Sequence, residues 1–191
     1  MPGKIILAGI DYSMTCPAIT VFEGATEWKP KHCKFYFAAH DSKYPGNYND
    51  IRLMGELLPS FDRNETRFNT IGDWAIDVLK LFHEVNFVGM ESYSFGSKGR
   101  TFHIAENTGL LKHKMWQKHI EFDVYAPTTI KKFATGSGRA KKPEMVEAFT
   151  KETGIDVRSV LGIKTKNIGS PEGDIADSYF ICKYTHSLLF P

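Results

Sequence analysis

The chain has 191 residues, which is the length of one ordinary globular domain. Its 24 Lys and Arg oppose 22 Asp and Glu, and 42% of its residues are hydrophobic, which excludes an intrinsically disordered chain and argues against a histone-like polybasic one. No apolar run approaches the roughly 20 residues that span a bilayer, so we expect no membrane partner. The N-terminus does not resemble a signal peptide, and the three cysteines lack metal-binding spacing, which favours a reducing, cytoplasmic compartment.

In chain order, apolar patterning predicts three successive strands, then strands that alternate with helices. The expected strands are residues 4–11, 17–22, 32–38, 86–91 and 121–125. The expected helices are residues 68–82, 101–119, 127–133, 143–153 and 174–186. Residues 40–64 are rich in turn-forming residues and are expected to be a loop with one short helix near residues 53–58. This order predicts a mixed α/β sheet with helices on both faces.

Carboxylates stand where two apolar strands end. Asp11 ends the first strand and Glu91 the fourth, while Asp174 and Asp177 are three residues apart and share one face of the last helix. If the four meet, they repel each other strongly, since two unit charges 4 Å apart cost about 4 kcal/mol at an effective dielectric of 20. Such a cluster persists by protonation or by binding cations, and oxygen ligands suit Mg²⁺ or Mn²⁺.

Each of these acids also has an ordinary structural interpretation. A single Asp at the end of a strand is most often a turn residue, and Asp174 is suited to cap the last helix. The combination of all four on this order of elements is more specific than any one of them.

Basic residues gather in a different part of the chain. Residues 129–142 hold five of them and no acid, namely Lys131, Lys132, Arg139, Lys141 and Lys142. Lys98 and Arg100 form a second basic loop after the Glu91 strand. The alternative is a solvated basic loop, but next to a carboxylate cluster the segment favours contact with phosphates.

The order of these motifs resembles the RuvC family of Holliday junction resolvases, within the ribonuclease H-like superfamily. The resemblance is found in five segments: GIDYS at residues 9–13, VGMESYSF at 88–95, ENTGLL at 106–111, PTTIKK with GSGRAKK at 127–142, and DIADS at 174–178. They cover most of the chain in the family's order. The resemblance implies a five-stranded sheet, three strands antiparallel and two parallel, flanked by helices in a single nuclease domain over residues 1–191.

The resemblance also implies roles for individual residues. Asp11, Glu91, Asp174 and Asp177 would hold two Mg²⁺ ions, with Mn²⁺ as a substitute, and Lys131 and Lys142 would contact phosphate near the scissile bond. Tyr93 or Phe95 would stack on an unpaired base. The implied protein is a homodimer that nicks opposing strands of a four-way junction and leaves 5′-phosphate and 3′-hydroxyl ends.

The chain departs from the family pattern at several positions. Met14 to Pro17 replace a common glycine, Ser178 replaces a common alanine, and the 40–64 segment is expected to be an insertion. These features are more similar to a viral or phage branch. Three alternatives stay open: a flap or RNA–DNA hybrid nuclease, an inactive junction-binding protein, and an actin-like ATPase, for which 191 residues is short.

Overall fold

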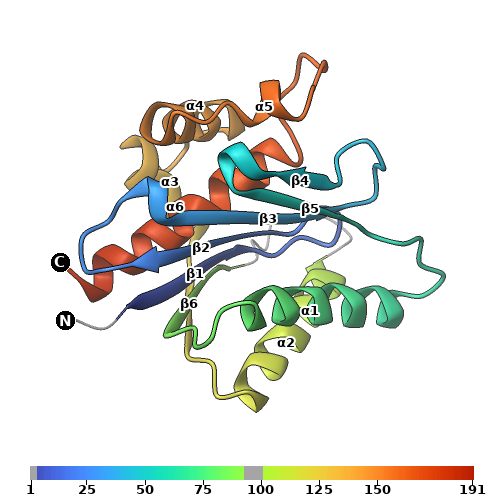
Figure 1. Cartoon of the computed structure of the whole chain (residues 1–191). Helices are drawn as coiled ribbons and strands as arrows, with labels where there is room; N and C mark the ends of the chain where they lie inside the picture. Colours follow the sequence, from blue (N-terminus) through green and yellow to red (C-terminus); the bar gives the residue numbers. More distant parts are fainter. Residues whose placement is uncertain (1–3, 93–100) are drawn as a thin grey trace.

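The computed structural model describes residues 4–92 and 101–191, and the strands within them form one mixed sheet. They are β1 (Ile5–Asp11), β2 (Ala18–Gly24), β3 (Cys33–Ala39), β4 (Gly46–Tyr48), β5 (Leu53–Leu57), β6 (Phe87–Glu91) and β7 (Phe122–Tyr125). The strand order is β4-β5-β3-β2-β1-β6-β7 (Figure 1). Strands β1, β2 and β3 form an antiparallel meander, whereas β6 and β7 run parallel to β1.

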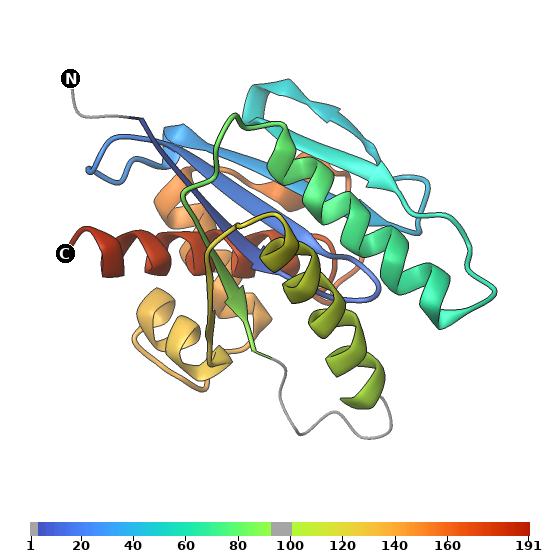
Figure 2. The same ribbon diagram turned by 90° about the horizontal axis from the view of Figure 1, so that it is seen from below.

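Helices cover both faces of this sheet (Figure 1). They are α1 (Asn64–Lys80), α2 (Thr101–Gln117), α3 (Pro127–Thr135), α4 (Lys142–Thr153), α5 (Val157–Val160) and α6 (Glu172–Leu189), with 3₁₀ turns at Pro30–His32 and Asn49–Ile51. Helices α1 and α2 lie side by side under one face (Figure 2), and α6 packs on β1 and β2 across the other. The predicted mixed α/β fold with helices on both faces is therefore confirmed. Within the described parts of the chain, no helix is long and apolar enough to cross a bilayer.

The prediction for residues 40–64 is wrong in detail, because this segment contributes two strands to the sheet. Strand β5 pairs in parallel with β3, and β4 forms the edge beyond it. Instead of a helix, residues 53–57 alternate between the two faces of the sheet, with Leu53 buried and Met54 exposed. The described sheet accordingly has seven strands where five were predicted.

Helix α6 lies very close to the central strands because glycines face it. A Cβ atom on Gly9 of β1 would overlap the backbone of Ser178 and Cys182, and one on Gly89 of β6 would overlap the hydroxyl of Thr185. On α6, Asp177 directly precedes Ser178, and Asp174 lies about one turn before it. The close approach thus brings the first turns of α6 to the edge where β1 and β6 end.

We expect Gly9→Ala to lower the free energy of unfolding by about 3 kcal/mol, since neither backbone can move without disturbing the core. Chemical denaturation would measure the loss. Gly169→Ala is the matched control, because its Cβ would meet no atom within 4 Å, and a change within about 0.5 kcal/mol is expected. Equal stability of the two variants would contradict the close packing of α6 on β1.

Candidate active site

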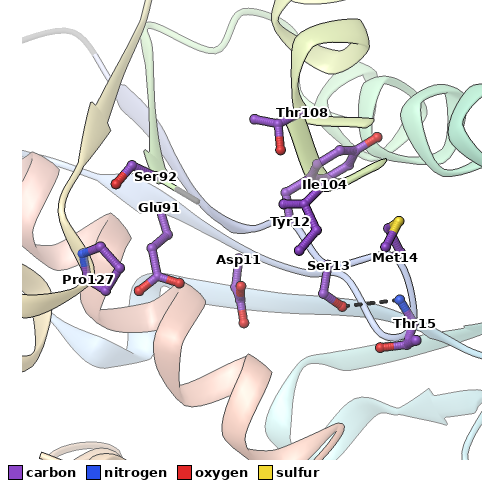
Figure 3. A pocket seen from close by; sticks show the side chains of 10 residues that line it. All are labelled: Asp11, Tyr12, Ser13, Met14, Thr15, Glu91, Ser92, Ile104, Thr108 and Pro127. Atoms are coloured by element: carbon purple, nitrogen blue, oxygen red, sulfur yellow. Dashed lines mark hydrogen bonds between the residues drawn. The ribbon is translucent and has the colours of Figure 1, made fainter. Parts of the chain in front are cut away.

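Three elements bring the predicted carboxylates to one edge of the sheet. Strands β1 and β6 are parallel neighbours with Ile10 opposite Met90, so Asp11 and Glu91 follow side by side at the two strand ends. Figure 3 shows both side chains pointing into the same space. Asp174 and Asp177 reach it from the first two turns of α6. Since carboxyl ends of parallel strands are where sites form in α/β sheets, this edge is the candidate active site.

A pocket of ≈ 290 Å³ opens at this edge. Its lining comes from the end of β1 and the loop after it, the end of β6, helix α2 and the start of α3: Asp11, Tyr12, Ser13, Met14, Thr15, Glu91, Ser92, Ile104, Thr108 and Pro127 (Figure 3). The turn after β1 is fixed by Ser13, whose hydroxyl accepts a hydrogen bond from the Cys16 N–H at 2.9 Å. Two of the four carboxylates, Asp11 and Glu91, therefore line the pocket.

Burial and repulsion between neighbouring charges raise the pKa of three of these carboxylates, Asp11, Glu91 and Asp177. Burial, followed by the charges of Asp174, Asp177 and Glu91, raises the pKa of Asp11 well above its usual value. Burial and the charge of Asp177 raise the pKa of Glu91 to about 7. Burial, together with Asp174 and against the opposing charge of Lys142, raises the pKa of Asp177 to about 6. All four groups therefore lie within electrostatic reach of one another, as the sequence predicted.

Two predicted lysines lie beside the carboxylates. Lys142 Nζ is 2.5 Å from Asp174 Oδ1. Burial opposes the charge on Lys142, but the nearby Asp174, Asp11 and Asp177 raise its pKa above the usual value. The positive charge of Lys131 partly offsets the rise in the pKa of both Glu91 and Asp177. Both lysines are thus placed to neutralise negative charge at this edge.

The donor set at this edge fits a hard divalent cation. The four acids offer only oxygen ligands, and Asp174 Oδ2 is buried without a hydrogen-bond partner, so a cation would satisfy an otherwise unpaired acceptor. Among residues 4–92 and 101–191, no three His, Cys, Asp or Glu side chains are already grouped as ligands of one ion, and Lys142 Nζ lies against Asp174. The oxygen atoms of the four acids are suitable ligands for a divalent metal ion, and Asp174 is ion-paired with Lys142.

The raised pKa values predict how pH and magnesium act on stability. Between about pH 4 and 7 the folded chain binds more protons at Glu91 and Asp177 than the unfolded chain, so these groups lower the free energy of unfolding as pH rises through that range. We expect that Mg²⁺ at about 100 times its Kd offsets this loss at pH 7.5 by about 2–3 kcal/mol, or about 5–10 °C in melting temperature.

Thermal melts from pH 5 to 8, with and without Mg²⁺, would measure both effects. Glu91→Gln is the matched variant, because it keeps the shape of the side chain and removes its titration, so its stability should depend less on pH and on Mg²⁺. Burial lowers the pKa of His186, and this contribution makes the free energy of unfolding rise with pH. It is the same in both proteins and cancels when their melts are compared. Identical pH and Mg²⁺ responses of the two proteins would contradict the assignment.

An ion pair between the partly exposed Arg158 and the buried Glu172, which the sequence analysis missed, supports the first turn of α6. Glu172 is 1% exposed, and its carboxylate accepts hydrogen bonds from Arg158 Nε at 3.0 Å and from the Gly169 N–H at 3.3 Å. A second nitrogen of the Arg158 guanidinium lies 2.5 Å from Glu172 Oε1 and also donates to Asn167 O at 3.1 Å. These contacts tie the loop before α6 to the helix, two residues ahead of Asp174. No local pattern marks this pair, because its members are 14 residues apart.

Two further observations refine the predicted site. Helix α6 begins at Glu172 with Pro171 at its N-cap, so the idea that Asp174 caps the helix is wrong. Cys16, which was not singled out, is buried beside Asp174, and burial followed by the Asp174 charge raises the pKa of its thiol. The thiol thus stays protonated at neutral pH.

The predicted DNA-binding residues fall into two groups. Lys132 is exposed on α3, and Arg139 and Lys141 are exposed on the segment that joins α3 to α4, in sequence beside the two lysines at the carboxylates. The other four lie outside the described residues: Tyr93, Phe95, Lys98 and Arg100.

Comparison with known proteins supports these features. The family model described as crossover junction endodeoxyribonuclease RuvC matches residues 56–168, which include Glu91, Lys131 and Lys142. No curated protein matches the chain in sequence. The match covers more than half of the chain, while Asp11, Asp174 and Asp177 lie beyond its ends.

Solved structures resemble the whole chain. Thermus thermophilus RuvC has a TM-score of 0.60 at 20% identity, with 97% of this chain and 98% of that chain covered. The same protein in complex with Holliday junction substrate has a TM-score of 0.61 at 18% identity, covering 97% of each chain. The Fowlpox virus resolvase in complex with substrate Holliday junction DNA has a TM-score of 0.52 at 17% identity, covering 98% and 100%.

At these identities the structures establish a shared ribonuclease H-like fold, with a sequence far diverged from its relatives. The family match and the fold agree with each other and with the acidic and basic motifs. The chain belongs to the RuvC family of crossover junction endodeoxyribonucleases.

Proposed function

We propose that the chain is a magnesium-dependent endonuclease that resolves four-way DNA junctions by paired nicks. The observation that carries the proposal is the meeting of Asp11, Glu91, Asp174 and Asp177, from three elements, beside Lys131 and Lys142. Family membership supports the reaction class, and two solved structures of similar fold contain Holliday junction DNA. We propose that residues 1–191 form one nuclease domain, with residues 40–64 as an addition to it.

Each residue of the site has a separate task in this proposal. Asp11, Glu91, Asp174 and Asp177 would hold two Mg²⁺ ions, for which Mn²⁺ would substitute. When bound, the ions supply Lewis-acid activation of the attacking water and of the scissile phosphate. Lys142 and Lys131 neutralise the negative charge that develops on the phosphate, and cleavage leaves 5′-phosphate and 3′-hydroxyl ends.

A substrate panel tests the choice of DNA. An immobile four-way junction, a flap, a Y-fork and an RNA–DNA hybrid of the same sequence would be compared in Mg²⁺, in Mn²⁺ and in EDTA. We expect the junction to be cleaved fastest and only with a divalent ion. Preferential cleavage of the hybrid or the flap would reassign the substrate, and binding of the junction without cleavage in either ion would favour an inactive junction-binding protein.

An exposed stripe on α2 supports a homodimer. Phe102 is 84% exposed and Trp116 is 68% exposed, and Ala105, Gly109 and His113 fall between them at helical spacing. Phe102 at one end, His113 stacked on Trp116 at the other, and the small residues Ala105 and Gly109 between them suit close packing against the same helix of a second copy. A two-fold dimer of this kind presents two active sites to a junction with near two-fold symmetry.

We expect the double variant Phe102→Glu and Trp116→Glu to sediment as a monomer, because it places buried like charges at a symmetric contact. Analytical ultracentrifugation at several concentrations would measure the mass. Leu188→Glu, an exposed apolar residue on α6, is the control and should leave the dimer intact. A double variant that sediments as the wild type would rule out this face as the interface.

A further inference from the structure

A second hollow lies along α3 (Pro127–Thr135), outside the carboxylate pocket. This groove has a volume of ≈ 520 Å³ and none of its lining residues is acidic. Its lining residues are Thr128, Thr129, Lys132, Phe133, Gly138 and Tyr184. None of the catalytic groups proposed above contributes to it, so the groove is a separate feature of the surface.

An aromatic side chain is partly exposed in this groove. Phe133 is 38% exposed, and its ring meets Tyr184 edge-on, with ring centroids 5.2 Å apart. Tyr184 is in turn held by Tyr125 at 5.0 Å in a second edge contact. The phenylalanine is thus fixed by packing while part of its ring stays accessible, which is the arrangement that lets a nucleobase stack on a protein surface.

The charge of the groove suits a phosphate. Lys132 is exposed, and no ion pair joins it to an acid in the described chain. The threonines at 128 and 129 add hydroxyl donors at the start of α3, which has Ala126 at its N-cap and no acidic residue in its first turn. Lys183 adds less, since its ammonium is 2.7 Å from Glu152 as well as 5.7 Å from the Phe133 ring centroid.

The groove and the carboxylate pocket are lined by neighbouring residues at the start of α3. Pro127 lines the pocket, and the next two residues line the groove. On α3, Lys131 acts electrostatically on Glu91 and Asp177, whereas its neighbour Lys132 lines the groove. A DNA strand that crosses Pro127 would therefore pass directly from the carboxylates into the groove.

We propose that this groove holds an unpaired nucleotide next to the scissile phosphate, with its base on Phe133 and its phosphate at Lys132 and the start of α3. The proposal rests on the proposed nuclease function and names the part of the substrate that this surface recognises. It makes Phe133 and Lys132 binding residues that select DNA able to release a base beside the cleavage site.

The test uses the full chain and a four-way junction in EDTA, where binding is measured without cleavage. 2-Aminopurine is placed at successive positions around the cleavage site, and its fluorescence and the Kd are recorded. We expect quenching at one position next to the scissile phosphate in the wild type. Phe133→Ala and Phe133→Leu should lose the quenching and bind about tenfold more weakly, whereas Phe133→Trp should keep both.

The lysine is tested by its salt dependence. Lys132→Gln should reduce the slope of log K against log salt by about one unit, and Lys151→Gln, an exposed lysine on α4, should leave the slope unchanged. Unchanged quenching and Kd in Phe133→Ala would overturn the proposal, as would a Phe133→Leu variant that behaves like the wild type. A loss of dimer mass in Phe133→Ala with unchanged quenching would assign the groove to a second copy of the chain and would also overturn it.

These outcomes are distinct from a failure of the nuclease function. If the wild-type protein in Mg²⁺ cuts none of the branched substrates, the proposed function fails, whatever the groove binds. If the wild type cuts the junction and Phe133→Ala retains quenching at the same position, only the groove proposal fails.

Discussion

Replacing Asp11 with asparagine is expected to reduce the cleavage rate of a four-way junction by about 10³-fold or more. Asp11 is the half-buried acid at the end of β1, and desolvation and the charges of all three other carboxylates raise its pKa, so it lies within electrostatic reach of the whole cluster. Asparagine keeps the shape of the side chain but removes the charge needed to hold a divalent ion. Single-turnover cleavage with saturating enzyme would measure the loss.

Binding separates a catalytic defect from a folding defect in this variant. Asp11→Asn should bind the junction within a few-fold of the wild type, because it removes a negative charge from a surface that meets phosphates. Asp41→Asn is the matched control, since Asp41 is exposed and paired only with Lys43, and cleavage within about twofold of the wild type is expected. Normal cleavage by Asp11→Asn would disprove the site assignment.

Breaking the Arg158–Glu172 pair is expected to destabilise the folded chain strongly. Glu172→Ala leaves the Arg158 guanidinium with no carboxylate partner, and because this guanidinium is 28% exposed we expect a loss of about 3 kcal/mol, the lower end for one partner of a buried pair. For a chain of this length that corresponds to a fall of about 6–12 °C in melting temperature. Denaturant unfolding and thermal melts would measure the change.

The same variant should weaken the response to magnesium while the chain is still folded. Asp174 follows Glu172 by two residues, so releasing the loop before α6 frees the first turn that positions this carboxylate. We expect the Mg²⁺ concentration for half-maximal cleavage to rise about tenfold, as for other residues that orient metal ligands. Glu65→Gln, which breaks an exposed pair with Arg63, should change neither quantity. If Glu172→Ala matches that control, the pair has no supporting role.

Local patterns in the sequence are sufficient to predict most of the fold. The continuous apolar run of β1 and the helical periodicity of α1 are properties of adjacent residues, and both elements form where expected. Strand β5 was missed because it pairs in parallel with the earlier strand β3, through contacts such as Phe35 with Leu53. Strand β4 pairs only with β5, and it lies in a stretch full of turn-forming residues. Pairing between distant segments leaves no local periodicity that the sequence could show.

The residues of the candidate site also fall into those that a local sequence pattern predicts and those that depend on tertiary packing. Asp11 and Glu91 were found because each directly ends an apolar strand, and Asp177 because it shares a helix face with Asp174. The Arg158–Glu172 pair, the thiol of Cys16 beside Asp174 and the groove at Phe133 depend on packing between separate elements. Such contacts are set by the tertiary structure and have no signature in residue spacing.

The most direct test of the central claim is the cleavage of a supercoiled plasmid that extrudes a cruciform. Two coordinated nicks across the junction convert this plasmid to a linear molecule, whereas a single nick gives a relaxed circle. The account predicts early linear product with Mg²⁺, ligatable ends bearing 5′-phosphate, and intact plasmid with EDTA or with Asp11→Asn. A wild-type protein that leaves the cruciform intact with Mg²⁺ and Mn²⁺, or that yields only relaxed circles, would contradict it.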